Sequence, residues 1–153
     1  MMIDEFTLVK SIGKGAFGEV YLSTKQGSPL LFATKKVSKQ KADSPTIHKY
    51  FMNEIKILQQ IKHKNIIHFE AIKHTVHNYY IITEFCNGGG LSDCLKKYQT
   101  IYGRAFPEEI VQHLMRQIVD GIKYLHGLRI IHRDIKLDNI LLWEVQLIWT
   151  QSY

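Results

Sequence analysis

Cysteines, long apolar runs and internal repeats are scarce or absent in this chain, and each absence excludes a class of protein. The two cysteines, Cys86 and Cys94, are too few for a disulfide framework and indicate a reduced, cytoplasmic setting. The longest apolar runs, such as residues 140–143, are far shorter than the ~20 residues that a membrane-spanning helix needs. The N-terminal residues also lack the basic and then apolar pattern of a secretory signal. We therefore expect a cytoplasmic protein without a membrane span.

What the sequence does contain is enough apolar material for one globular core. The 153 residues are 45% hydrophobic and 22% charged, which is typical of a folded domain rather than a disordered one. The formal net charge of +6 raises the question of nucleic-acid binding, and lysines cluster at 35–41. No aromatic residues interleave with that cluster to form a stacking platform, so a basic surface that favours anionic ligands is the better interpretation. We expect no nucleic-acid partner.

Up to residue 85 the sequence reads mostly as strands, interrupted by one helix. Extended segments are expected at 6–12, 20–22, 30–37, 66–72 and 79–83. Ser44 and Pro45 suit the start of a helix, and apolar residues follow at helical spacing as far as Ile61. Glu54 falls within this apolar stripe, so we predict that it faces inward and has a cationic partner.

Beyond Cys86 the pattern becomes helical. A glycine-rich break at 87–90 precedes a short helix at 91–98 and a long one at 107–127 with an acidic first turn. The expected fold class is α+β. We predict a β-rich unit and its hinge over 1–86, the first part of a helical unit over 87–142, and a divergent tail over 143–153.

Three glycines, Gly13, Gly15 and Gly18, have the spacing G-x-G-x-x-G, and we call residues 13–18 the glycine loop. A dinucleotide fold with this spacing needs a helix directly after the third glycine and an acidic residue about 20 positions later. Here residues 19–24 alternate like a strand, and Ser38 stands where the acid is needed. The context therefore predicts a loop between two strands that covers phosphate groups with its backbone amides. An ordinary hairpin loop is the alternative.

Charged residues with phosphate chemistry occur before and after the predicted helix. Lys35 follows an apolar strand segment and is suited to neutralise phosphate oxygens, with Glu54 as its expected partner; two unrelated surface charges are the alternative. Residues 132–139, which we call the catalytic loop, read H-R-D-x-K-x-x-N. An exposed polar turn after a helix is the alternative interpretation of this second motif.

Together these motifs resemble the eukaryotic protein kinases of serine/threonine type. The resemblance implies an N-terminal antiparallel sheet lobe with one helix, followed by the first part of a helical C-terminal lobe. It also implies that Asp134 accepts or orients the substrate hydroxyl proton and that Asn139 binds Mg²⁺. Lys136 would offset charge on the transferred phosphoryl group, and a lysine there is similar to the serine/threonine-specific members. The implied cofactors are ATP and Mg²⁺, and the implied partner is a protein substrate.

The resemblance also implies a nucleotide site. Its predicted residues comprise apolar walls for the base, a threonine behind it, two hinge residues that bind its edge through their backbone, and phosphate-binding groups: Ile12, Val20, Ala33, Leu141, Thr83, Glu84, Cys86, Gly13, Gly15, Gly18, Lys35 and Glu54. For each apolar position, ordinary core packing is the alternative. Gly90 stands where the family often has an acid that contacts the ribose, so a ribose contact is not expected.

The resemblance runs from about residue 6 to residue 142 and stops before the family's Asp-Phe-Gly motif. The tail places Trp149 or Ser152 where the metal-binding aspartate is expected. We therefore expect a truncated product whose long helix exposes a large apolar patch. A non-catalytic fragment that binds nucleotide or protein partners is the alternative function. Within the kinases, residues 85–91 look most like the autophagy-initiating branch or the calcium/calmodulin-dependent group.

Overall fold

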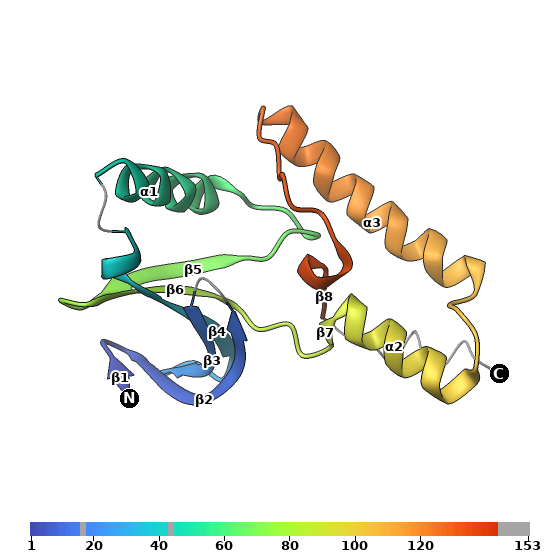
Figure 1. The fold of residues 1–153 in the computed structure, drawn as a ribbon, viewed down its shortest axis with the longest axis horizontal. Coiled ribbons are helices and arrows are strands. Elements are labelled where there is room, and N and C mark those ends of the chain that lie inside the picture. The colour runs from blue at the N-terminus through green and yellow to red at the C-terminus, as the bar shows by residue number, and fades with distance from the viewer. Residues whose placement is uncertain (16–17, 43–44, 144–153) are drawn as a thin grey trace. The chain divides into compact units, whose positions relative to one another are not determined.

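The computed structural model describes residues 1–15, 18–42 and 45–143 (Figure 1). Two compact units are present: of the described residues, the first contains those within 1–62 and 66–85, and the second contains 63–65 and 86–143. None of the described helices has the length and apolar character needed to cross a membrane. Each unit has its own elements and its own buried core.

The first unit is built on a six-stranded antiparallel sheet, in the order β1-β2-β3-β4-β6-β5. Its strands are β1 (Met2–Ile3), β2 (Phe6–Gly15), β3 (Gly18–Lys25), β4 (Leu31–Ser38), β5 (Phe69–His74) and β6 (Asn78–Glu84). The predicted strands are confirmed, although the segment expected from residue 66 becomes a strand only at Phe69. Buried side chains, among them Phe6, Phe32 and Ile82, pack on the sheet.

One helix accompanies this sheet, as the sequence predicts. A short 3-10 turn, η1 (Lys39–Ala42), leads towards α1 (Pro45–Gln60), which packs against β5 (Figure 1). Ile55 is buried on α1, and Phe51, Met52 and Leu58 are half-buried. These positions form one helical face centred on Ile55. Burial of this apolar face, rather than helix propensity alone, stabilises α1.

The second unit contains two helices and a short antiparallel pair of strands that come from distant parts of the chain. Its elements are β7 (Gly89–Gly90), α2 (Leu91–Tyr102), α3 (Glu108–Gly127), η2 (Leu137–Asn139) and β8 (Leu141–Leu142). Leu91, Cys94 and Tyr98 of α2 form its core with Ile110 and Leu142. Gly88 is required beside this core, because an added Cβ would lie 2.6 Å from the carbonyl oxygen of Leu142. α2 ends at Tyr102 and is capped by Gly103, whose left-handed φ of 65° favours glycine.

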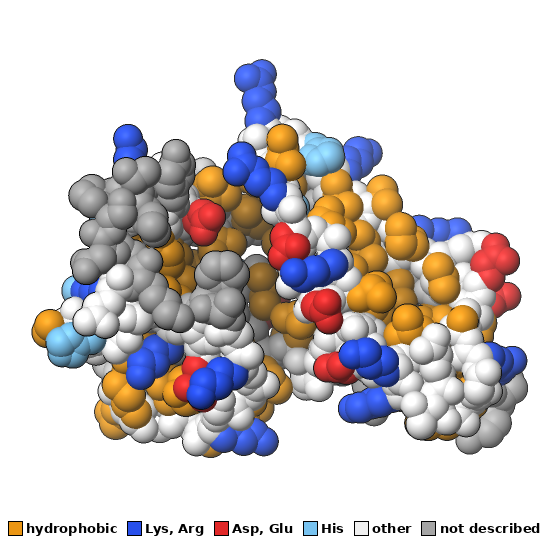
Figure 2. All heavy atoms as spheres, viewed as in Figure 1, with side chains coloured by type: hydrophobic (Ala, Val, Ile, Leu, Met, Phe, Trp, Pro, Cys, Tyr) orange, Lys and Arg blue, Asp and Glu red, His pale blue; other side chains and the backbone are white. Residues whose placement is uncertain are grey.

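α3 buries one face and exposes another apolar one. Ile110 and Leu125 are buried, whereas Val111, Met115 and Val119 are 43%, 49% and 55% exposed. The exposed three recur every four residues and so form a stripe along the helix. Figure 2 shows hydrophobic side chains gathered along α3. The predicted exposure of apolar surface on the long helix is confirmed.

Candidate active site

Gly13 and Gly15 lie at the end of β2 and Gly18 begins β3, so the predicted position of the glycine loop between two strands is confirmed. Gly15 pairs with Gly18, and Gly13 pairs with Val20. β3 follows Gly18 directly, in contrast to the helix that a dinucleotide fold requires. Gly18 has a φ of 147°, and an added Cβ there would overlap the carbonyl oxygen of Lys36. Only glycine fits this position without a shift of the backbone.

Four predicted nucleotide-site residues share one face of the sheet. Val20 pairs with Lys35 across β3 and β4, and Ala33 pairs with Thr83 across β4 and β6. Direct partners point to the same side of a sheet, as do residues two apart on a strand. Val20, Ala33 and Thr83 are half-buried, and Lys35 is exposed. The structure therefore gathers three apolar or small side chains and one ammonium group on this face.

The prediction that Glu54 faces inward is wrong. Its side chain is exposed on α1, and no ion pair joins the described residues Lys35 and Glu54. Successive residues of an α-helix are about 100° apart, so Glu54 lies at the margin of the face centred on Ile55. The spacing of the apolar residues correctly predicted a buried face on this helix, but it did not show where that face ends.

The two predicted hinge residues lie where the first unit ends: Glu84 is the last residue of β6, and Cys86 follows two positions later. The backbone N–H of Glu84 donates to the carbonyl oxygen of His68 (3.0 Å), and its carbonyl accepts from the Thr83 hydroxyl (3.3 Å). The Glu84 side chain in turn accepts from the backbone N–H of His68 (2.7 Å). Cys86 is half-buried and is the first residue of the longer segment of the second unit. The Glu84 N–H is already occupied, whereas its carbonyl oxygen can accept a second hydrogen bond besides the one from Thr83.

Two further predicted wall residues are exposed. Ile12 on β2 is 40% exposed and Leu141 on β8 is 46% exposed. Leu141 belongs to the second unit and pairs with Gly90. Neither is part of the buried core, so core packing does not explain these two apolar residues.

The catalytic loop brings together all three predicted catalytic residues of the second unit. Asn139 Nδ2 donates to Asp134 Oδ2 (2.7 Å) and to the Asp134 carbonyl (2.9 Å). Lys136 Nζ lies 3.1 Å from the same Asp134 Oδ2. Arg133 has a left-handed φ of 68°, so the chain bends just before Asp134. The bend and the short turn η2 place Lys136 and Asn139 beside the Asp134 carboxylate.

Hydrogen bonding sets the charge state of that carboxylate. The Lys136 ammonium and then the Asn139 amide lower the pKa of Asp134 below its usual value, and the slight burial of the group opposes them. The positive charge of Lys136 also lowers the pKa of Asp134. A lowered pKa means that the anion is present at neutral pH and is lost only as the pH falls through the folded-state value. Asp134 is therefore an acceptor, suited to receive a hydrogen bond from a hydroxyl group.

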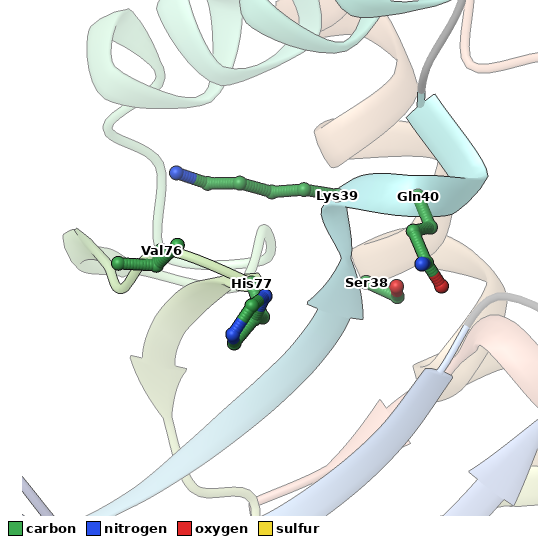
Figure 3. A pocket seen from close by; sticks show the side chains of 5 residues that line it. All are labelled: Ser38, Lys39, Gln40, Val76 and His77. Carbon is green, nitrogen blue, oxygen red and sulfur yellow. The ribbon is translucent and has the colours of Figure 1, made fainter.

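A separate surface pocket of about 300 Å³ lies at the far end of β4. It is lined by Ser38, Lys39, Gln40, Val76 and His77. Figure 3 shows the Lys39 side chain extending away from Ser38 and Gln40, so the polar groups do not converge on one point. The Lys39 ammonium lies 4.8 Å from the centre of the Tyr79 ring. None of the predicted site residues lines this pocket.

The sequence profile of the protein kinase domain matches residues 6–148. The chain belongs to the protein kinase family. It is 34% identical over 140 residues to the serine/threonine-protein kinase Nek3 of Mus musculus, and 33% identical over 147 residues to testis-specific serine/threonine-protein kinase 4 of Homo sapiens. The matched residues are 92% and 94% of this chain. The predicted resemblance to serine/threonine kinases is confirmed.

The kinase relatives are much longer than this chain. It spans 26% of Nek3, 43% of the testis-specific kinase and 22% of serine/threonine-protein kinase ATG1a of Arabidopsis thaliana, to which it is 33% identical over 92% of its own length. The chain is also similar to a crystal structure of Rad53 1-466 in complex with AMP-PNP, with a TM-score of 0.78 and 30% sequence identity. The match covers 94% of this chain and 36% of the Rad53 chain. This kinase structure confirms the predicted fold class. Near-equal identities to differently named kinases leave the assignment to one branch a prediction.

Two groups of interacting residues were not predicted from the sequence. Glu19 accepts hydrogen bonds from Ser11 and Tyr21 beside the glycine loop. The sequence contains a signal for this contact, because Glu19 and Tyr21 are two positions apart on a strand and therefore lie on the same face. The second group joins His63 and Asn65 to Asp120. A separation of 55 residues hides that contact from any local pattern. The expected tail positions Trp149 and Ser152 lie outside the described residues.

Proposed function

We propose that this chain contains the nucleotide-binding and catalytic-loop residues of an ATP-dependent serine/threonine protein kinase. The observation that carries the proposal is the arrangement of Lys136 and Asn139 around the ionised Asp134. That arrangement combines a hydrogen-bond acceptor with a cation and a carboxamide, which are the groups that phosphoryl transfer needs. Membership of the kinase family and the AMP-PNP in the Rad53 structure support a nucleotide as the ligand.

The nucleotide would bind the face of the sheet that carries Val20, Ala33, Lys35 and Thr83. The apolar side chains, with Ile12 and Leu141, would enclose the base, and the backbones of Glu84 and Cys86 would bind its edge. Backbone amides of the glycine loop and the Lys35 ammonium would bind the phosphates. The exposed Glu54 adds no support to a role in this site.

In the transfer step, Asp134 would orient the substrate hydroxyl and accept its proton. The hydroxyl oxygen forms a bond to the γ-phosphorus of ATP, the bond from that phosphorus to the bridging oxygen breaks, and ADP leaves. The Lys136 ammonium would offset the negative charge that spreads over the transferred oxygens. The products are ADP, a phosphorylated serine or threonine, and the proton held at Asp134.

The residues present fit a magnesium ion in part. Mg²⁺ prefers oxygen ligands and commonly takes only one or two from the protein, with phosphates and water completing its shell. Asn139 donates through Nδ2, which leaves Oδ1 available as a ligand. No cluster of three or more His, Cys, Asp or Glu side chains that could hold a metal occurs among the described residues. Bound Mg²⁺ would supply charge neutralisation between the phosphates.

A phosphotransfer assay tests the proposal. Purified chain is incubated with Mg²⁺, labelled ATP and a mixed library of serine and threonine peptides. We expect transfer that falls at least about 100-fold in Asp134→Asn, because the acceptor for the proton is lost. Asp138→Asn is the matched control, since it removes an exposed carboxylate from the same loop. Transfer that is equal in wild type and Asp134→Asn would refute the assignment of Asp134.

A non-catalytic binding module is the second candidate, and the exposed apolar stripe of α3 favours it. Val111, Met115 and Val119 offer a surface for a protein partner. A thermal-shift titration distinguishes the two candidates. Stabilisation by MgATP that disappears in Lys35→Met, without any turnover, would support the binding module. Turnover that depends on Asp134 would favour the enzyme.

A further inference from the structure

A carboxylate joins the two strands that flank the glycine loop. Glu19 is the first residue after Gly18, and it accepts one hydrogen bond of 2.7 Å at each oxygen: Oε1 from Ser11 Oγ and Oε2 from Tyr21 Oη. Ser11 lies on β2 and Tyr21 on β3, and the two residues are direct cross-strand partners. We call Ser11, Glu19 and Tyr21 the hairpin bridge. It connects β2 to β3 through side chains immediately beside the loop.

The hairpin bridge lies where the backbone pairing is irregular. The register between β2 and β3 shifts between Ser11 and Gly13, which is the last step before the glycine loop. A β-bulge of this kind disrupts the ladder locally, bends the strand and increases its twist. The side-chain hydrogen bonds of the bridge add connections between the strands at this point. The bridge therefore supports the hairpin where its backbone hydrogen bonds support it least.

The bridge occupies the opposite face of the sheet from the predicted nucleotide residues. Glu19 pairs with Lys36, and the neighbouring Val20 pairs with Lys35. Because side chains alternate along a strand, Glu19 and Tyr21 lie on the other side from Val20 and Lys35. The bridge can thus fix the position of the loop without occupying the face where phosphates would bind.

Hydrogen bonds from the two hydroxyl groups keep the bridging carboxylate ionised. The hydrogen bond from Tyr21, then that from Ser11, lowers the pKa of Glu19, while slight burial opposes them and the charges of Lys14 and Lys36 assist. The same bond to Glu19 raises the pKa of Tyr21, with Tyr80 a smaller contributor. Glu19 is an anion and Tyr21 is neutral at pH 7, so both hydroxyl groups act as donors.

We propose that Glu19 is a positioning residue of the glycine loop: its carboxylate holds β2 and β3 in the arrangement in which the loop amides bind phosphate. This inference rests on the proposed nucleotide-binding function. Glu19 itself does not contact the reacting atoms. Its effect reaches the ligand through the backbone of residues 13–15 and 18.

Amide hydrogen exchange in the protein without nucleotide tests the inference independently of nucleotide binding. In Glu19→Ala we expect the amides of Gly13, Lys14, Gly15 and Gly18 to exchange about five-fold faster, while those of β5 and β6 are unchanged. Glu109→Gln is the control, because it removes an exposed carboxylate from α3. Uniform acceleration across the sheet, or no acceleration at the loop, would overturn the inference. Ser11→Ala serves as a milder variant in case Glu19→Ala does not fold.

A double-mutant cycle and a pH series separate positioning from general stability. Tyr21→Phe should accelerate loop exchange in the wild type but add nothing in the Glu19→Ala background, because its hydrogen-bond acceptor is already gone. Because the folded-state pKa of Glu19 is lowered, loop protection should persist above that value and decline as the pH falls through it. In Glu19→Gln the decline should be absent. Additive effects, or a pH response that survives Glu19→Gln, would contradict the role assigned to the carboxylate.

Nucleotide binding completes the test. We expect the Kd for a fluorescent ATP analogue to rise about five-fold in Glu19→Ala, in parallel with the faster loop exchange. An unchanged Kd with faster exchange would overturn the link to phosphate binding. If the wild type binds no nucleotide, the proposed function fails, and the exchange data alone decide whether Glu19 positions the loop.

Discussion

Tyr80 carries a buried hydroxyl group that the first unit does not satisfy. Its side chain is fully buried with Ile3 and Leu8, and its Oη has no hydrogen-bond partner among the described residues. Removal of an unpaired buried hydroxyl relieves its desolvation cost, which is about 1–3 kcal/mol. We expect Tyr80→Phe to raise the free energy of unfolding by about 1 kcal/mol in urea denaturation. Tyr21→Phe, which removes a paired hydroxyl, should lower it; a loss of stability in Tyr80→Phe would show that its hydroxyl is satisfied in solution.

Single residues also show how far the sequence predicts the site. Asp134, Lys136 and Asn139 are close along the chain, so their motif predicts a local arrangement that the structure reproduces. Lys35 and Glu54 lie on different elements, and their pairing depends on how α1 is rotated on the sheet. The apolar spacing defines a stripe, but a residue about 100° from its centre lies at the boundary between buried and exposed. Glu54 has that position, which is why its burial was predicted wrongly.

At the scale of elements, the segment 63–65 belongs to the second unit although its neighbours along the chain belong to the first. Asp120 Oδ2 on α3 accepts from Asn65 Nδ2 (3.0 Å) and lies 3.5 Å from His63 Nε2. The His63 ring stacks on Tyr124, with 4.8 Å between ring centres. The Asn65 backbone N–H donates to His63 Nδ1 (3.1 Å), so in the neutral ring the proton is on Nε2 and faces Asp120.

These contacts predict that Asp120 stabilises the second unit. Asp120→Ala should lower the free energy of unfolding by about 1–2 kcal/mol, because Asn65 and His63 lose their shared acceptor. Asp120→Asn keeps an oxygen acceptor and should cost about half as much. Asp93→Ala is the control: its pair with Lys96 is exposed at 3.7 Å, and such pairs contribute little. If urea denaturation showed equal losses of unfolding free energy in Asp120→Ala and Asp93→Ala, Asp120 would not stabilise the second unit through these contacts.

Elements were predicted from sequence with unequal success. In β4, β6 and the start of β2, buried residues alternate with more exposed ones, and a period of two in the sequence records that difference. α3 is long and strongly periodic, so its existence and type are also predicted. The attachment of residues 63–65 to α3 leaves no periodic signal, because it depends on contacts between residues far apart in the chain. Residues 63–65 are therefore positioned by polar contacts with a distant helix, which the sequence around them does not reveal.

For the molecule as a whole, the exposed stripe of α3 is the feature with the clearest consequence in solution. Val111, Met115 and Val119 are each more than 40% exposed and lie on one side of the helix. A contiguous apolar surface of this kind binds hydrophobic dyes and favours association. We expect Met115→Glu to reduce the fluorescence of bound ANS by about half relative to wild type, because a charge divides the stripe at its centre. Gln117→Glu adds the same charge at another exposed position of α3 and should leave dye binding unchanged. If both variants reduce the fluorescence equally, net charge rather than the stripe controls dye binding, and the stripe is not the dominant apolar surface of the protein.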